Sequence, residues 1–331
     1  MKTIMKIEIA LLVIVVLVAA GMILVSDGLF GLLEEPVLLE REPVAIPTEV
    51  VTEPPQVTEP VETVPEQKAT DPRQITATRY FAYDLREDTY LIQEGDGDAK
   101  LYPASITKLL TTYVILQHMK PEAKVTVGDA MTLVQPDSSV AKLEEGDVLT
   151  VEQLIEAMLL PSGNDAAQVA AVAAGRAIAE DSSLPCTEAV QVFMEEMNRQ
   201  AEALGLQNSH FVTPDGFHDD NHYTSMNDLV TLCKTVLTVP TIQKYAGMAK
   251  DTVTVSGREL EWENTNFLLD SQKELYRANA IGMKTGYTSK AGSCLVSAFF
   301  MEDRILLIGV FGCPAFTDDR YLDTLAIYNN I

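Results

Sequence analysis

The pattern of apolar and polar positions divides the chain into three parts. Residues Ile9 to Val25 form an unbroken apolar run of 17, and the segment after it is dominated by proline and acidic residues. From Arg73 onwards, apolar residues recur at the spacings of strands and helices. We therefore predict a membrane anchor over residues 1–33, an extracellular linker over 34–72 and one folded domain over 73–331.

The pattern within the folded domain is extended at both ends and helical between them. Runs of strand-forming residues separated by turns predict five strands, over residues 77–84, 89–93, 280–287, 293–300 and 304–311. Helical spacing predicts helices over residues 165–179 and 188–204, and a last helix over 318–329 that packs back on the sheet. The predicted fold class is α+β: an antiparallel sheet made from both chain ends, flanked by helices, with an inserted helical region.

Two further predicted helices carry polar residues of chemical interest. Ser105 and Lys108 share one helical face, one turn apart. The opposite face is apolar, with Ile106, Leu109, Leu110, Tyr113 and Val114. Another helix starts at a capping box formed by Thr150 and Gln153 and stops at Pro161, so that it places Ser162, Gly163 and Asn164 at its end.

The N-terminal apolar run has the features of a membrane segment. Its length is at the short end for a spanning helix, and Lys2 and Lys6 on its N-terminal side place the rest of the chain outside the cytoplasm. Val18-Ala19-Ala20 is a candidate cleavage site, but the apolar run continues five residues beyond it. We favour an uncleaved anchor, and a cleaved signal peptide that releases a secreted protein is the alternative.

The segment from Glu34 to Pro72 cannot form a core. It holds 8 of the 16 prolines and 10 acidic residues against 2 basic ones. Such a composition favours an extended, polyproline-like chain, and at about 3.1 Å per residue it would reach on the order of 120 Å. That reach suits a tethered domain whose substrate lies in a cell wall, although a linker without any length requirement fits equally well.

The composition excludes some classes of function and of fold. Lys+Arg 24 against Asp+Glu 48 gives a net charge of -24, which opposes nucleic-acid binding and requires a local positive group for any anionic substrate. Four scattered cysteines, Cys186, Cys233, Cys294 and Cys313, are too few for a disulfide framework, and we expect buried free thiols.

The Ser105 and Lys108 pair suggests nucleophilic catalysis. A serine hydroxyl is a weak nucleophile at neutral pH, and a lysine amine becomes its base only if burial or a nearby cation lowers the pKa of the amine from about 10.4. The Ser-x-x-Lys spacing alone is weak, because it recurs at Ser139 and Lys142.

The order of three short motifs makes the signal specific. Ser105-x-x-Lys108 is followed by Ser162-Gly163-Asn164 at a helix end and by Lys284-Thr285-Gly286 on a predicted strand. The other copies have ordinary interpretations, since Ser139 lies in a loop-like Pro-Asp-Ser-Ser run and Ser225 with Asp228 looks like a helix cap.

With these motifs, residues 77–325 resemble the penicillin-binding and active-site serine β-lactamase superfamily, most closely the low-molecular-weight D-alanyl-D-alanine carboxypeptidases. Four further segments are similar to that subfamily: residues 160–166, 213–216 with 222–223, 264–266 and 282–288. Class A β-lactamases have Asp where this chain has Gly163, and the Glu that holds their deacylating water has no convincing counterpart here.

The resemblance implies a role for each motif residue. Ser105 would be the acyl-enzyme nucleophile and Lys108 its general base, Ser162 would relay a proton to the leaving amine, and Asn164 would hold Lys108 and the substrate amide. Lys284 and Thr285 would receive the terminal carboxylate, Gly286 would let the substrate approach the strand, and the N–H groups of Ser105 and Tyr287 would stabilise the oxyanion. We also expect Lys284 to lower the pKa of Lys108.

A metal site is not expected. His218 and His222 have the spacing of a zinc-protease helix, but Gly216 and the intervening Asp219, Asp220 and Asn221 weaken any helix there. No cofactor is implied by the motifs or by the resemblance.

The sequence thus predicts an outward-facing serine D-Ala-D-Ala carboxypeptidase in the cell membrane, with peptidoglycan pentapeptides as substrate and β-lactams as acylating inhibitors. A class A-like β-lactamase and a non-catalytic cell-wall-binding or sensing module are the alternatives. Many relatives carry an added C-terminal β-rich domain that this sequence does not include, so we expect the N-terminal segment to provide the anchor.

Overall fold

The computed structural model describes residues 74–331. The predicted anchor and linker lie outside this range, and within it no helix combines the length and apolarity needed to cross a bilayer. The first described residues are tied to the C-terminal helix. The backbone N–H groups of Thr76 and Ala77 both donate to the Asp323 carboxylate near the C-terminus, at 2.9 Å.

The centre of the fold is a five-stranded antiparallel sheet with the strand order β2-β1-β9-β8-β7. Its strands are β1 (Arg79–Asp84), β2 (Thr89–Glu94), β7 (Ala280–Thr288), β8 (Gly292–Met301) and β9 (Arg304–Cys313). The N-terminal hairpin pairs with the C-terminal one through β1 and β9, with Phe81 opposite Gly309. This arrangement confirms the predicted sheet built from both chain ends.

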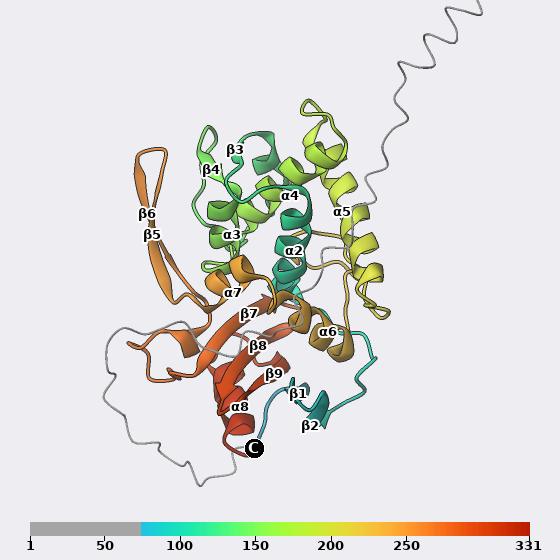
Figure 1. Ribbon diagram of the computed structural model, residues 1–331, viewed down its shortest axis with the longest axis vertical. Helices are drawn as coiled ribbons and strands as arrows, with labels where there is room; N and C mark the ends of the chain where they lie inside the picture. The colour runs from blue at the N-terminus through green and yellow to red at the C-terminus, as the bar shows by residue number, and fades with distance from the viewer. Residues whose placement is uncertain (1–73) are drawn as a thin grey trace, which may run out of the picture. The chain divides into compact units, whose positions relative to one another are not determined.

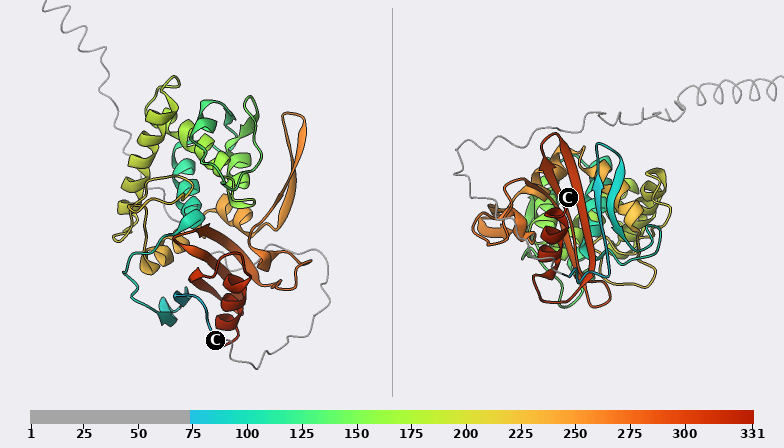
Figure 2. Two further views of the ribbon diagram at one scale, coloured as in Figure 1. Left: turned by 180° about the vertical axis from the view of Figure 1, so that it is seen from behind. Right: turned by 90° about the horizontal axis from the view of Figure 1, so that it is seen from below.

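The residues between the two hairpins form a helical region that lies against one face of the sheet (Figure 1). Its helices are α2 (Lys108–His118), α3 (Val151–Leu159), α4 (Asn164–Ile178), α5 (Cys186–Ala203), α6 (Met226–Val236) and α7 (Pro240–Gly247). Three short 3-10 helices are η1 (Ala104–Thr107), η2 (Asp129–Leu133) and η3 (Phe267–Leu269). α8 (Asp319–Tyr328) packs on β8 and β9 at the C-terminal end of the fold (Figure 2).

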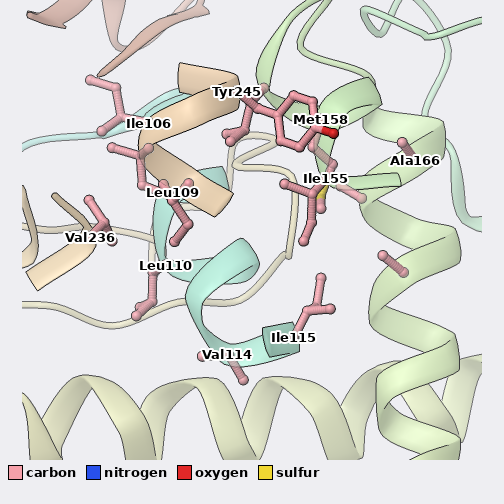
Figure 3. Close-up of a cluster of buried hydrophobic side chains, with 14 of the residues drawn as sticks. Ile106, Leu109, Leu110, Val114, Ile115, Ile155, Met158, Ala166, Val236 and Tyr245 are labelled. Atoms are coloured by element: carbon pink, nitrogen blue, oxygen red, sulfur yellow. The ribbon is translucent and has the colours of Figure 1, made fainter. Parts of the chain in front are cut away.

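Two apolar clusters hold these layers together. The larger one surrounds α2, whose residues Leu109, Leu110, Val114 and Ile115 are fully buried. Figure 3 shows this stripe facing side chains from α3, α4, α6 and α7. The smaller cluster joins α8 to the other face of the sheet. Apart from Tyr113, which is half-buried, the predicted apolar stripe opposite Ser105 is therefore buried at the centre of the helical region. This burial sets the direction in which the polar side of the same segment faces.

Several local predictions are confirmed. The side chains of Thr150 and Gln153 make the reciprocal capping box at the start of α3, and the Ser225 hydroxyl caps α6 by accepting from the N–H of Asp228 at 3.1 Å. All four cysteines are free and buried.

The structure adds elements that the pattern did not predict. Two small hairpins are present, β3 (Lys124–Thr126) with β4 (Val148–Thr150), and β5 (Lys250–Val255) with β6 (Arg258–Glu263). The first has only three residues in each strand, too few for a recognisable alternation. In the second, Val253, Val255, Leu260 and Trp262 are buried on one face, while the other face is polar and carries three exposed glutamates on β6.

Candidate active site

The predicted nucleophile does not lie within an α-helix. Ser105 belongs to the 3-10 turn η1, and α2 begins three residues later at Lys108. The preceding Ala104 has φ +48°, a left-handed conformation that costs a non-glycine residue about 1–2 kcal/mol. This correction leaves the pairing intact, because a 3-10 turn also brings residues three apart to the same face. Ser105 is half-buried, with its hydroxyl beside the amine of Lys108.

Lys108 is fully buried and makes three hydrogen bonds. Its Nζ lies 2.9 Å from the Ser105 hydroxyl, 2.7 Å from the Asn164 side-chain oxygen and 2.9 Å from the Asp215 backbone carbonyl. Burial lowers the pKa of Lys108 to about 8, and the carboxylates of Asp215 and Asp165 oppose this shift. At pH 7 about a tenth of this amine is therefore neutral.

The geometry orients the lone pair of the neutral amine. The two carbonyl oxygens of Asn164 and Asp215 can only accept hydrogen bonds, so each takes one N–H of Lys108. The remaining tetrahedral position faces the Ser105 hydroxyl. When Lys108 is neutral, that position holds the lone pair, and the amine can take the serine proton.

The second motif lies where α3 ends and α4 begins. Ser162 has φ +63° and is buried, and Asn164 is the first residue of α4. There is no room for a side chain at Gly163, where an added Cβ would lie 2.8 Å from the Ala157 carbonyl oxygen. Among residues 74–331 the Ser162 hydroxyl has no hydrogen-bond partner. It is therefore free to bond a bound molecule.

The Asp165 carboxylate holds the neighbouring loop against this turn. It accepts hydrogen bonds from the N–H groups of Ala141 and Leu143, at 2.8 and 3.1 Å. The backbone carbonyl of Ser139 accepts from the N–H of Asn164 at 2.8 Å. The second Ser-x-x-Lys copy thus lies in a wall of the site. Its Lys142 is exposed, unlike Lys108.

The third motif is on β7, the edge strand of the sheet. Lys284 is 1 % exposed, and its Nζ is 3.4 Å from both the Thr265 hydroxyl and the Thr285 carbonyl. Burial, together with repulsion from Lys108 and Arg320, holds the pKa of Lys284 well below its usual value. The expected repulsion between the two lysines is therefore present. Its effect falls on Lys284, whereas the pKa of Lys108 is lowered by burial.

Thr285 and Thr265 connect the strand to the rest of the site. Their hydroxyls are 2.5 Å apart. The N–H of Thr265 donates to the Leu160 carbonyl at the end of α3, and the Thr265 carbonyl accepts from the Tyr321 hydroxyl of α8 at 2.5 Å. The loop containing Thr265 therefore joins the helical region, the edge strand and the C-terminal helix.

Gly286 also lies against the backbone that carries Ser105. An added Cβ would lie 2.8 Å from the Pro103 carbonyl oxygen and 3.2 Å from the Ser105 nitrogen. The missing side chain therefore lets β7 approach the backbone that carries Ser105. The next residue, Tyr287, is 39 % exposed, and its ring contacts that of Phe316 at 5.1 Å.

Three groups at the site were not identified from the sequence. Arg320 contributes a third positive charge near Lys284, and its Nε is buried without a hydrogen-bond partner. Asp215 and Thr265 act through a backbone carbonyl and a loop hydroxyl. Both belong to segments noted only for their resemblance, and nothing in their residue type predicts contact with a lysine.

The two histidines with zinc-protease spacing do not share a site. His222 is buried and bonds to Thr107 and to backbone N–H groups, whereas the Nε2 of His218 is 3.3 Å from Asp220. Within residues 74–331 no group of three or more His, Cys, Asp or Glu side chains is arranged to hold a metal ion.

Comparison with known proteins agrees with this geometry. Residues 66–314 match the family model for D-alanyl-D-alanine carboxypeptidase. The chain is 28% identical over 232 residues to the D-alanyl-D-alanine carboxypeptidase DacF of Bacillus subtilis, covering 69% of this chain and 55% of that one. It is 31% identical over 254 residues to DacA of Haemophilus influenzae, covering 74% and 59%.

A solved structure extends the similarity to three dimensions. The Streptomyces DD-transpeptidase is 29% identical and covers 78% of this chain and 97% of its own, with a TM-score of 0.68. The similarity confirms the predicted D,D-peptidase-like fold. The chain spans somewhat more than half the length of the two curated relatives.

Proposed function

We propose that this chain, which belongs to the D-alanyl-D-alanine carboxypeptidase family, removes the terminal D-alanine from peptidoglycan stem peptides through an acyl-enzyme on Ser105. The observation that carries the proposal is the position of the Lys108 amine. It is buried, has a pKa of about 8 and is held by two acceptors so that its third position faces the Ser105 hydroxyl.

The reaction would proceed in two stages. Neutral Lys108 takes the Ser105 proton as the oxygen attacks the carbonyl carbon of the penultimate D-alanine, and the N–H groups of Ser105 and Tyr287 stabilise the oxyanion. The C–N bond then breaks, Ser162 relays the proton held by Lys108 to the leaving amine, and free D-alanine departs. In the second stage neutral Lys108 takes a proton from the water that attacks the ester carbonyl, and it gives that proton to Ser105 as the ester C–O bond breaks. Asn164 holds both Lys108 and the substrate amide.

The terminal carboxylate would bind beside Lys284. This ammonium has only two long hydrogen bonds, at 3.4 Å, and the charge of Arg320 lies close by with its Nε unpartnered. A buried ammonium with the partly buried guanidinium of Arg320 close by favours an anionic ligand. We assign Thr285 and Arg320 to the same carboxylate, together with Lys284.

The location of the enzyme rests on sequence alone. We propose a single-pass membrane protein with its catalytic domain on the extracytoplasmic side, held by residues 1–33. The apolar run from Ile9 to Val25 and the preceding Lys2 and Lys6 support this orientation.

The proposed function is tested by intact-protein mass spectrometry after benzylpenicillin treatment, with a time course of adduct loss, and by D-alanine release from a D-Ala-D-Ala peptide. We expect a long-lived adduct and D-alanine release in the wild type. Ser105→Ala should lose both, and the control Ser139→Ala should keep both. Rapid loss of the adduct without D-alanine release would indicate a β-lactamase, and neither adduct nor release would indicate a binding module.

A further inference from the structure

His222 connects the segment that carries Asp215 to the segment that carries the two catalytic residues. The imidazole is 2 % exposed, and the ring of Phe211 packs against it edge-on at 5.4 Å. One ring nitrogen, Nε2, is 2.8 Å from the Thr107 hydroxyl. The other, Nδ1, is 3.1 Å from the N–H of Val212 and 3.3 Å from that of Thr213.

These partners define the protonation state of the ring. Backbone N–H groups can only donate, so Nδ1 is an acceptor without a proton, and Nε2 carries the hydrogen and donates to Thr107. A protonated ring would direct an N–H at two other N–H groups. Burial lowers the pKa of His222 to about 4, against the opposing effect of Asp215 and Asp219 and with a further lowering by His210 and His218. The neutral ring is therefore the form present over the whole range in which Lys108 titrates.

The segment held by His222 continues directly to the Lys108 acceptor. Thr111 of α2 donates to the Pro214 carbonyl at 2.6 Å, and Lys108 donates to the next carbonyl, that of Asp215. Gly216 then packs on the Ala104 carbonyl, where an added Cβ would lie at 1.9 Å. Among the described residues this segment pairs with no strand. Its position depends on these contacts with η1 and α2, and on the Asp215 carboxylate, which accepts from the side chain of Gln168 in α4 at 3.0 Å.

We propose that His222 is a positioning residue, which holds the 212–215 segment on Thr107 so that the Asp215 carbonyl accepts from Lys108 and the third position of the amine faces Ser105. This inference rests on the proposed role of Lys108. His222 does not touch the reacting atoms. Its effect passes through the His222–Thr107 hydrogen bond, and that bond can be removed from either end.

The test uses the full chain and two readouts. His222→Asn and Thr107→Val each break the bridge, the first from the ring and the second by removing only the accepting hydroxyl. His210→Asn is the matched control, because His210 bonds to the Asn221 carbonyl and makes no contact with η1 or α2. The first readout is the second-order rate constant for acylation by benzylpenicillin. The second is the pKa of Lys108, followed by NMR of lysine labelled with ¹³C at Cε.

We expect both bridge variants to slow acylation at least about tenfold and to move the pKa of Lys108 by at least about half a unit, because the amine loses a fixed acceptor. The double variant should be acylated no more slowly than the slower single variant. The acylation rate constant of the control should stay within about twofold of the wild-type value. Unchanged pKa values, or losses that multiply in the double variant, would overturn the inference. A moved pKa in a protein that penicillin never acylates would support the bridge and contradict the proposed function.

Discussion

At the scale of single residues, the site contains two buried lysines whose proposed roles need different protonation states. In the proposed reaction Lys108 loses its proton to act as a base, whereas Lys284 keeps its proton to bind a carboxylate. Their contacts differ accordingly. Lys108 has two fixed acceptors and the serine hydroxyl, while Lys284 has only two long hydrogen bonds and a neighbouring arginine charge. A bound carboxylate would stabilise the charged form of Lys284 and so separate the two roles.

The pKa of Lys108 predicts the pH dependence of acylation. Only the neutral amine accepts the Ser105 proton, so the rate constant for acylation by benzylpenicillin should rise with pH and reach half of its upper value near pH 8. Lys108→Arg should lower the rate by at least about a thousandfold and abolish this rise, because the guanidinium stays charged. Lys142→Arg, in the exposed second motif copy, should leave the profile unchanged. A rate that is independent of pH between 6 and 9 would contradict a base role for Lys108.

The proposed carboxylate contact predicts a different result for two substrates. Lys284→Ala should lose a charge-assisted hydrogen bond of about 1.5–3 kcal/mol, which lowers kcat/KM about 10- to 150-fold on a D-Ala-D-Ala peptide. A peptide with an amidated C-terminus has already lost that contact, so the same mutation should lower its kcat/KM much less. Measuring both peptides on both proteins forms a thermodynamic cycle. Equal losses would mean that Lys284 does not bind the carboxylate.

At the scale of elements, the site depends on close backbone contacts at two glycines. Gly286 lets β7 reach the backbone of residues 103–105, and Gly216 lets the 212–216 segment reach Ala104. These contacts bring the edge strand β7 and a loop of the helical region against the same short turn. The distance between Ser105, Lys108 and Lys284 is therefore set by backbone packing rather than by side chains alone.

Gly216→Ala should damage the protein more than an otherwise similar substitution. Gly205 has φ +81° and open space around it, so Gly205→Ala costs only the left-handed conformation, about 1–2 kcal/mol. Gly216 has φ +80°, and its added Cβ would lie 1.9 Å from the Ala104 oxygen, which adds about 1–3 kcal/mol of overpacking. Urea unfolding measures both costs, and acylation should slow only in Gly216→Ala. Equal losses of stability would mean that the segment moves away freely.

The elements also show which features the sequence pattern can predict. The five strands of the central sheet and the helices α4, α5 and α8 were predicted to within a few residues, because most of them bury an apolar face with its own period. The 3-10 turn at Ser105 was missed, because its conformation depends on contacts with Gly216 and Gly286, more than a hundred residues away. For the same reason the backbone contact of Gly286, the charge of Arg320 and the Asp215 carbonyl were not predicted.

At the scale of the whole molecule, positive charge at the site contrasts with an acidic background. Residues 1–72 contain 12 acidic and 4 basic residues, so the folded domain has 36 acidic against 20 basic ones and a net charge of -16. The overall field therefore opposes the approach of an anionic peptide. In the proposed function, binding comes from Lys284, Arg320 and their neighbours at short range, where the burial of Lys284 limits screening by salt.

The last prediction concerns the division between the N-terminal segment and the folded domain. Residues 34–72 are too rich in proline and acidic residues to bury a core, and the fold closes near Thr76, whose N–H bonds to Asp323 of α8. A protein that starts at Arg73 should therefore be soluble, with the melting temperature and the kcat/KM of the full chain on a soluble D-Ala-D-Ala peptide. The full chain should sediment with membranes at its full mass.

A different outcome would contradict each part of this prediction. If removal of residues 1–72 lowers the melting temperature by more than a few degrees, those residues stabilise the domain and are not a simple tether. If the full chain is expressed but recovered in the medium, shortened near Ala20, the N-terminal run is a cleaved signal peptide. If it is full-length and soluble, the apolar run does not anchor the protein. The anchored, the cleaved and the soluble full-length forms all contain the three motifs. Their kcat/KM on the soluble peptide should therefore be the same.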